Sequence, residues 1–189
     1  KSIGTSMGRL IIDKNSTKWW CTNTDGLISY NESINKFKKI TLGSDKGNLP
    51  TTDVRAIAVD NRNQLWIGTF KGLRILSSVD RFVSDTEFTT TSIIIQEGDL
   101  AQELFYQQTI LDIVVDGANN KWVSIADGGI FLVSSNGQET IYQFTKSNSP
   151  LPSNNVNDIE IDGVTGEVFF ATDMGMVSFL GTSTKPSDD

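Results

Sequence analysis

One motif of short strands and turns recurs along the chain, and this repetition limits the possible folds more than any other feature. The clearest copy spans residues 54–75. It consists of an alternating run that ends at Asp60, a polar turn, an apolar run around Trp66, and a turn at Lys71 and Gly72 before a further short strand. The same order recurs at residues 8–30, 110–132 and 156–179.

Three kinds of residue align the copies. Each first strand ends at an aspartate, at Asp13, Asp60, Asp116 and Asp162. A large aromatic residue follows in each second strand, at Trp20, Trp66, Trp122 and Phe169. A glycine six positions later marks the next turn, at Gly26, Gly72, Gly128 and Gly175. Successive glycines lie 46, 56 and 47 residues apart, a period typical of β-propellers with four strands in each blade.

The pattern predicts an all-β fold: a β-propeller segment of about four four-stranded blades, taken from a larger, seven-bladed propeller. The predicted blades occupy residues 7–48, 49–108, 109–150 and 151–181, and residues 182–189 form a polar tail or linker. Glycine suits the tight hairpins because it tolerates positive φ. The recurrent aromatic side chain can wedge between neighbouring sheets. A single blade cannot bury both of its faces, so the blades are expected to stack.

The long gap between the second and third glycines holds an insertion. Residues 92–95 and 103–106 flank the sequence Glu97–Gly98–Asp99, which favours a hairpin. This hairpin is interpreted either as a lengthened outer strand pair of the second blade or as a flap beside it. The fourth copy shows three clear strands, and residues 1–5 would supply the missing one if four blades closed into a ring. We favour an open arc, whose exposed edges would be covered by oligomerisation.

Charge and composition exclude some classes of function. The net charge of −7 and the pI near 4.6 argue against nucleic-acid binding. The densest basic cluster, Lys36, Lys38 and Lys39, is interpreted as a solvated strand edge. Cys21 lies in a strand pattern beside Trp20 and is expected to be a small buried residue. No signal peptide or membrane span is expected within the chain.

Catalytic and metal chemistry find little support. The chain has no histidine, which excludes Ser-His-Asp and Cys-His arrangements and histidine-based metal sites. Paired carboxylates remain at Glu97 with Asp99 and at Glu160 with Asp162, and the second pair could share one face of a strand. The segment 60–63 offers oxygen ligands without the closing glutamate of a calcium loop, so it is interpreted as a turn. We therefore predict no cofactor, no metal site and no enzymatic activity.

A ligand site on a propeller is expected in loops held by the rigid scaffold. The turns between second and third strands share one rim with the loops that lead into the inner strands. On this rim we predict six candidate ligand-binding residues: Phe70, Lys71, Asp127, Asn154, Asp173 and Met174.

Two segments carry a resemblance to a known repeat. The second copy, from Leu49–Pro50 through Trp66-Ile67-Gly68-Thr69 to Gly72–Leu73, resembles the two-component regulator propeller repeat. So does the fourth, from residues 151–156 through Asp162 to residues 169–175. The resemblance implies a β-propeller and an extracytoplasmic sensor domain of a hybrid two-component histidine kinase.

A narrower resemblance is densest over residues 109–182. The runs 115–122, 129–134, 148–151 and 165–170 resemble the last propeller blades of the PorZ family, surface components of the type IX secretion system in Bacteroidetes. Gly129 and Ser124–Ile125 depart mildly from the usual repeat. This resemblance implies a non-catalytic binding or scaffold module at the cell surface or in the periplasm, with protein partners or surface lipopolysaccharide and glycan. The sensor domain is the alternative, and a lyase or hydrolase is the least favoured.

Overall fold

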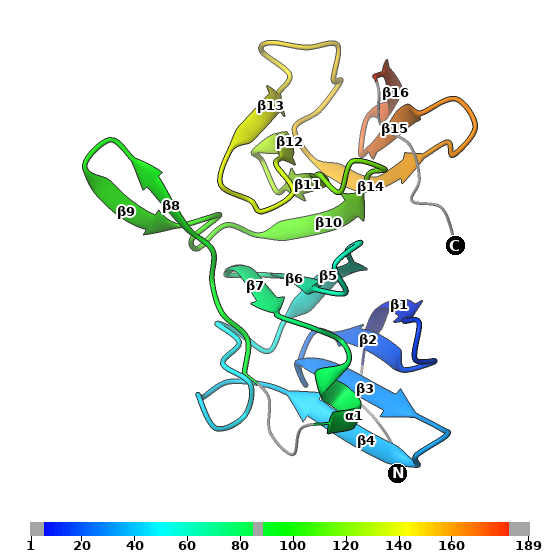
Figure 1. Ribbon diagram of the computed structural model, residues 1–189. Coiled ribbons are helices and arrows are strands. Elements are labelled where there is room, and N and C mark those ends of the chain that lie inside the picture. Colours follow the sequence, from blue (N-terminus) through cyan, green and yellow to red (C-terminus); the bar gives the residue numbers. More distant parts are fainter. Residues whose placement is uncertain (1–5, 85–88, 182–189) are drawn as a thin grey trace.

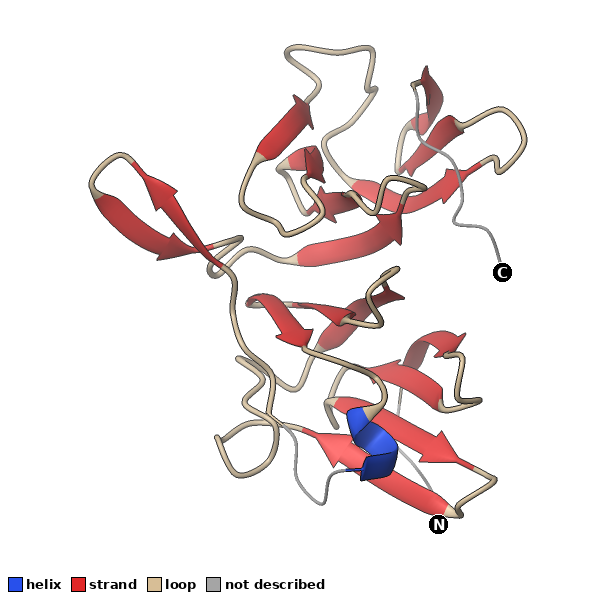
Figure 2. Cartoon of the chain, viewed as in Figure 1, coloured by secondary structure: helices blue, strands red, loops and turns tan. Residues whose placement is uncertain are grey.

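The computed structural model describes residues 6–84 and 89–181, and nearly all of its regular structure is β-strand (Figures 1 and 2). The first sheet contains β1 (Met7–Ile12), β2 (Lys18–Thr22), β3 (Leu27–Asn31) and β4 (Lys36–Ile40). The second contains β5 (Val54–Val59), β6 (Leu65–Thr69) and β7 (Gly72–Leu76). The third contains β10 (Ile110–Val115), β11 (Lys121–Ile125), β12 (Gly129–Val133) and β13 (Thr140–Phe144). The fourth contains β14 (Val156–Ile161), β15 (Glu167–Thr172) and β16 (Gly175–Leu180).

Within every sheet, each strand pairs antiparallel with the next strand along the chain. The four sheets follow one another as an open arc, numbered here as blades 1 to 4 (Figure 1). Their inner strands β1, β5, β10 and β14 lie beside one another in that order. The chain is thus a β-propeller segment, as the sequence predicts. Residues 1–5, considered as a closing strand, and the predicted tail 182–189 lie outside the described residues.

A turn built on aspartate ends each inner strand. Asp60 Oδ1 accepts hydrogen bonds from the backbone amides of Arg62 and Gln64, both at 2.9 Å. Asn63 adopts the left-handed conformation within this turn, with φ of 60°. Asp13 and Asp116 each accept two backbone amides in the same way, with Ser16 and Asn119 at positive φ. Asp162 accepts the backbone amide of Val164, and Gly166 has positive φ. The predicted strand-ending turns are confirmed.

Three hydrophobic clusters lie between consecutive blades. Trp19, Trp66 and Trp122 occupy equivalent positions on β2, β6 and β11, and each packs toward the following blade. The assignment of Trp20 to this position is therefore wrong: Trp20 lies on the opposite face of β2. Phe169 is the equivalent of Trp122 in blade 4, but its face points away from blade 3 and is only partly buried.

The turn between β11 and β12 differs from the sequence prediction. Gly128 does not have positive φ; the left-handed positions are Asp127, with φ of 58°, and Gly129, with φ of 82°. Ile125 pairs with Gly129, so this turn has three residues, whereas Thr69 pairs with Gly72 across a two-residue turn. The additional residue in the turn moves the glycine requirement by one position.

The insertion forms a flap and not a strand pair of blade 2. Its strands β8 (Ile94–Glu97) and β9 (Leu100–Glu103) make a separate two-stranded sheet that projects from the outer side of the arc (Figure 1). Beyond β7, the described part of blade 2 continues as an isolated bridge between Ile75 and Thr91. The short helix α1 (Arg81–Ser84) inserts Phe82 into the first cluster, edge-on to Trp19 at 5.8 Å.

Both ends of the arc present apolar side chains to solvent. On β1, Leu10 and Ile12 are exposed, whereas their equivalents in blade 2, Ile57 and Val59, pack into the first cluster. On β16, Met176 and Leu180 are about two-thirds exposed or more, at 66% and 73%. These are the faces on which neighbouring blades pack inside the arc. Within the described residues, no helix has the length and apolar character needed to cross a membrane.

Candidate functional site: the turn rim and the inner-strand ion pairs

The turns between second and third strands lie beside the loops that lead into the inner strands, forming what we call the turn rim. One backbone hydrogen bond ties turn to loop in three blades: Phe70 N to Asp53 O, Ala126 N to Thr109 O, and Asp173 N to Asn155 O. The six residues predicted from sequence all lie on these turns and loops. Their role in ligand binding stays a prediction.

Asp127 and Asn154 are brought into contact where blade 3 meets blade 4. Asn154 Nδ2 donates to the Asp127 carbonyl at 3.2 Å, and its Oδ1 accepts from the Lys146 amide at 2.7 Å. Asn155, which the sequence analysis did not select, accepts from the Asp127 amide at 2.8 Å and donates to the Asp127 carboxylate at 3.0 Å. These polar groups mainly hold the turn to the loop, so they have limited capacity left for a ligand.

Phe70 and Lys71 lie apart from that cluster, on the β6–β7 turn. Phe70 is 45% exposed, and the guanidinium carbon of Arg55 lies 5.0 Å from its ring centroid. Asp53 holds Arg55 by an ion pair at 2.9 Å. This turn therefore displays an aromatic ring covered by a fixed cation, with the exposed Lys71 beside it.

Asp173 and Met174 form the third part of the rim, on the β15–β16 turn. Both are exposed, Met174 at 67%. The Met174 amide donates to Thr172 Oγ1 at 3.1 Å, which fixes the turn, while the Met174 side chain is exposed to solvent. The six predicted residues thus form three separate groups on the rim, and those on the β6–β7 and β15–β16 turns have exposed side chains.

Near the start of the inner strands, one arginine joins blades 1, 3 and 4. Arg9 of β1 forms ion pairs with Asp112 of β10 at 2.7 Å and with Asp158 of β14 at 2.8 Å. Asp112 is almost fully buried and accepts the amides of Ile113 and Ile159, both at 2.8 Å. Burial raises the pKa of Asp112 to about 6, although Arg9 and the two amides oppose the shift.

From the sequence, these three charged residues can be related to one another only by their equivalent positions in the strands. Arg9, Asp112 and Asp158 occupy equivalent positions on three inner strands, each directly before a large aliphatic residue. Sequence spacing does not show that the strands converge closely enough for one side chain to reach two others. The group places one arginine between two aspartates of different blades.

Of the catalytic candidates considered from sequence, Cys21 and Asp162 have structural roles. Cys21 is fully buried, and burial raises the pKa of its thiol to about 12, which disfavours the reactive thiolate. Asp162 accepts the Val164 amide and the Thr165 hydroxyl, both at 2.8 Å, as a turn residue does. Glu160 is exposed on β14 and Asp99 at the hairpin tip, while the Glu97 side chain lies outside the described residues. Among the described residues, no group of His, Cys, Asp and Glu side chains could hold a metal ion.

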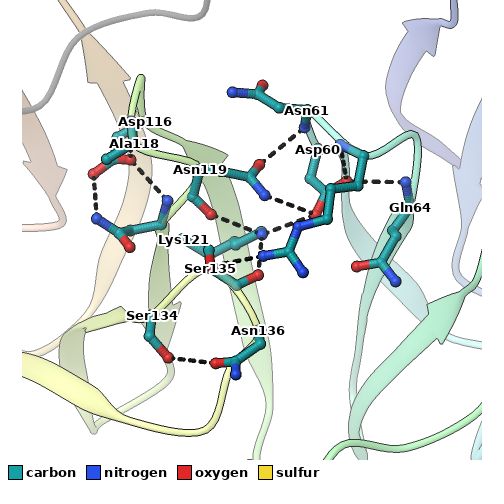
Figure 3. Close-up of polar contacts among 12 residues, drawn as sticks. Asp60, Asn61, Gln64, Asp116, Ala118, Asn119, Lys121, Ser134, Ser135 and Asn136 are labelled. Carbon is teal, nitrogen blue, oxygen red and sulfur yellow. Dashed lines mark hydrogen bonds and ion pairs between the residues drawn. The ribbon is translucent and has the colours of Figure 1, made fainter.

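The most buried charged pair, Lys121 with Asp60, joins blade 3 to blade 2 (Figure 3). The Lys121 ammonium donates to Asp60 Oδ2 at 2.9 Å, to the Asn119 carbonyl at 2.8 Å and to the Ser135 carbonyl at 2.7 Å. An ammonium has three protons, so none remains for a ligand. Burial acts to raise the pKa of Asp60, but the hydrogen bonds from Lys121 and the turn amides outweigh it and hold that pKa below its ordinary value. This network holds blades 2 and 3 together and is not a binding site.

Comparison with known proteins supports the fold and the repeat. The family model described as "Two component regulator propeller" matches residues 48–71. Among curated protein sequences, no significant match is found. The resemblance predicted from the second copy is thereby confirmed for that repeat.

Three solved structures illustrate the likeness. PorZ, an essential surface component of the type IX secretion system of Porphyromonas gingivalis, matches 98% of this chain at 23% identity with a TM-score of 0.86. The extracellular domain of the one component system BT4673 from B. thetaiotaomicron matches 92% at 21% identity with a TM-score of 0.66. An ancestral GH74 enzyme matches 96% at 16% identity with a TM-score of 0.70. The chain spans only 27%, 21% and 24% of these three proteins, respectively.

Proposed function

We propose that this chain is a non-catalytic binding and scaffold module of a Bacteroidetes cell-surface protein, located outside the cytoplasm and resembling PorZ. The observation that carries the proposal is the match to PorZ over 98% of the chain with a TM-score of 0.86. The engagement of Asp162 in its turn and the burial of Cys21 also favour a role without catalysis.

The turn rim is the proposed contact surface, and surface lipopolysaccharide with an anionic polysaccharide is the proposed ligand. Lys71 on the β6–β7 turn and Arg55 on β5, which lies over the ring of Phe70, place two cations at this part of the rim. Because the chain as a whole carries −7, an anionic polymer would be attracted only locally. Binding should therefore weaken as salt screens this patch.

Surface plasmon resonance with immobilised lipopolysaccharide, with and without an anionic O-polysaccharide, tests the proposal. We expect the protein to bind the anionic form, and Lys71→Glu to weaken that binding by about tenfold, the equivalent of about 1.4 kcal/mol. Lys14→Glu, at the opposite end of the inner strands, should bind as the wild type does. Equal binding by both variants, or no binding to either lipopolysaccharide, would refute the proposed ligand site.

A second candidate is the ligand-sensing propeller of a hybrid two-component histidine kinase. The match of the regulator repeat at residues 48–71 and the likeness to BT4673 favour it. A sensor should bind a small soluble ligand that raises the unfolding temperature by mass action. Thermal shift with lipopolysaccharide-derived oligosaccharides, compared with the intact polymer, separates this function from surface attachment.

A further inference from the structure

A groove lies between the β8–β9 flap and the outer strands of blade 3, away from the turn rim. Its volume is about 560 Å³, within the range of small-molecule sites. Both flap strands, the segment that follows β9, and strands β12 and β13 contribute to its walls. The flap strands pair only with each other, so the groove exists because the insertion stands off from the blades.

Neutral amide side chains dominate this groove. Five of the seven glutamines in the chain line it, although they come from separate segments: Gln96, Gln102, Gln108, Gln138 and Gln143. The only charged lining residue is Glu103, which Arg74 engages at 3.0 Å. Within the described part of the chain, the side-chain amides of Gln108, Gln138 and Gln143 have no intramolecular hydrogen-bond partner.

An aromatic ring stands exposed at the same groove. Tyr106 lines the wall and is 60% exposed, and Gln107 donates a hydrogen bond to its hydroxyl at 3.1 Å. The residues on either side, Phe105 and Gln107, have φ of 57° and 56°, a backbone conformation that is unfavourable for residues other than glycine. Phe105 is buried and packs edge-on to Phe131 at 5.3 Å, so core packing holds this strained turn in place.

We propose that this groove binds an uncharged saccharide segment. Each glutamine amide offers a donor and an acceptor, which matches the hydroxyl groups of a sugar. The face of Tyr106 offers an apolar platform for the C–H face of a sugar ring. The single carboxylate is already paired, so nothing in the groove selects for ligand charge. An extended polypeptide would need pockets for alternate apolar side chains, and the polar lining favours the saccharide.

This site is distinct from the turn rim, so its test is independent of the proposed function. Isothermal titration calorimetry with the 189-residue chain would use maltotetraose, cellotetraose, xylotetraose and mannotetraose as neutral probes. We expect at least one of them to bind, and Tyr106→Ala and Gln143→Ala to weaken it by about tenfold, as loss of one stacking or hydrogen-bonding contact does. Tyr106→Phe should keep most of the affinity, because the ring remains.

Matched variants keep the result interpretable. Gln64→Ala removes a glutamine outside the groove, and Lys71→Glu alters the rim, so both should bind the neutral probe as the wild type does. Near-ultraviolet circular dichroism verifies that each variant is folded. The proposal is overturned if no neutral probe binds, or if binding is insensitive to Tyr106→Ala and Gln143→Ala. Reduced, unfolded casein serves as a polypeptide probe in the same titration. If casein alone binds, and its binding depends on Tyr106, the groove is a polypeptide site and the saccharide proposal is wrong.

Discussion

Two aspartates at equivalent turn positions use their second carboxylate oxygen differently. Asp13 Oδ2 accepts the indole N–H of Trp19 at 2.9 Å. Asp60 Oδ2 instead accepts the buried Lys121 ammonium, whose nitrogen lies 4.5 Å from the Trp66 ring centroid. The indole N–H of Trp66 is left without a hydrogen-bond partner among the described residues. Blade 1 thus has a tryptophan–aspartate hydrogen bond within the blade, whereas at the equivalent aspartate of blade 2 the Lys121–Asp60 ion pair connects two blades.

Replacing Lys121 should destabilise the fold strongly. Lys121→Met leaves the buried Asp60 carboxylate without its cation, and breaking a buried pair from one side costs about 3–5 kcal/mol. The matched control is Lys18→Met: Lys18 has the equivalent position on β2, but its pair with Glu32 at 3.4 Å is solvent-exposed and should contribute less than about 1 kcal/mol. Urea unfolding measures both. Equal losses of stability in Lys121→Met and Lys18→Met would contradict the role of the buried ion pair in holding blades 2 and 3 together.

The folded-state pKa of Asp112, about 6 against an ordinary 3.8, predicts a pH dependence of stability. Between these values the native state holds a proton that the unfolded state releases, so stability falls as pH rises through this window. A shift of this size corresponds to about 3 kcal/mol. Asp112→Asn cannot ionise, so its stability relative to the wild type should increase by about 2–3 kcal/mol between about pH 4 and pH 7. A pH-independent difference in unfolding free energy would refute this assignment.

At the scale of single elements, the turn between β11 and β12 depends on one glycine. Gly129 has φ of 82°, and a Cβ at this position would collide with the carbonyl oxygen of Phe144. That oxygen belongs to the backbone of the neighbouring strand and cannot move alone. Gly98, at the flap tip, also has positive φ, but nothing lies within 4 Å of its Cβ position.

Gly129→Ala should therefore cost more than Gly98→Ala. Backbone strain alone costs about 1 kcal/mol and applies to both variants, whereas the collision adds about 1–3 kcal/mol at Gly129 only. Differential scanning calorimetry of the two variants gives the comparison. If Gly98→Ala proved the more damaging, the placement of the left-handed glycine in this turn would be wrong.

The outcomes for individual residues show how far sequence spacing reaches. The aspartate turns were predictable because turn chemistry is local and recurs at each strand end. Trp19 and Trp20 were exchanged because adjacent tryptophans on a strand buried on both faces leave the phase of alternation open. Gly128 was chosen over Gly129 because the pattern does not reveal a turn longer by one residue.

The rim could be located from the strand order, but its partnerships could not. Asn154 and Asn155 both form hydrogen bonds with Asp127, a turn residue 27 and 28 positions earlier in the sequence, and nothing in the local sequence singles out Asn155. The Arg9 group and the glutamine groove join segments from different blades. Such contacts depend on how the sheets are placed relative to one another, which the periodicity within one copy does not specify.

At the scale of the whole molecule, the two end faces of the arc are complementary. Inside the arc, the face that carries Trp122 packs on the opposite face of the next blade. The end face of blade 4 carries Phe169, Met176 and Leu180, while the end face of blade 1 carries Leu10 and Ile12. An exposed apolar patch of this kind favours association. The same geometry that stacks consecutive blades would place the fourth blade of one copy against the first blade of another.

We therefore predict that the 189-residue chain self-associates head to tail. Sedimentation equilibrium should show concentration-dependent association for the wild type and a monomer for the double variant Met176→Lys, Leu180→Lys. The double variant Leu10→Lys, Ile12→Lys should also be monomeric, because a heterologous contact needs both faces. An equimolar mixture of the two should form dimers, since each variant keeps the face that the other lacks.

The control Ile94→Lys, Leu100→Lys charges the flap and should leave association unchanged. If only one face proved necessary, or the mixture stayed monomeric, the contact would be isologous or absent, and the stacking geometry of the blades would not govern association.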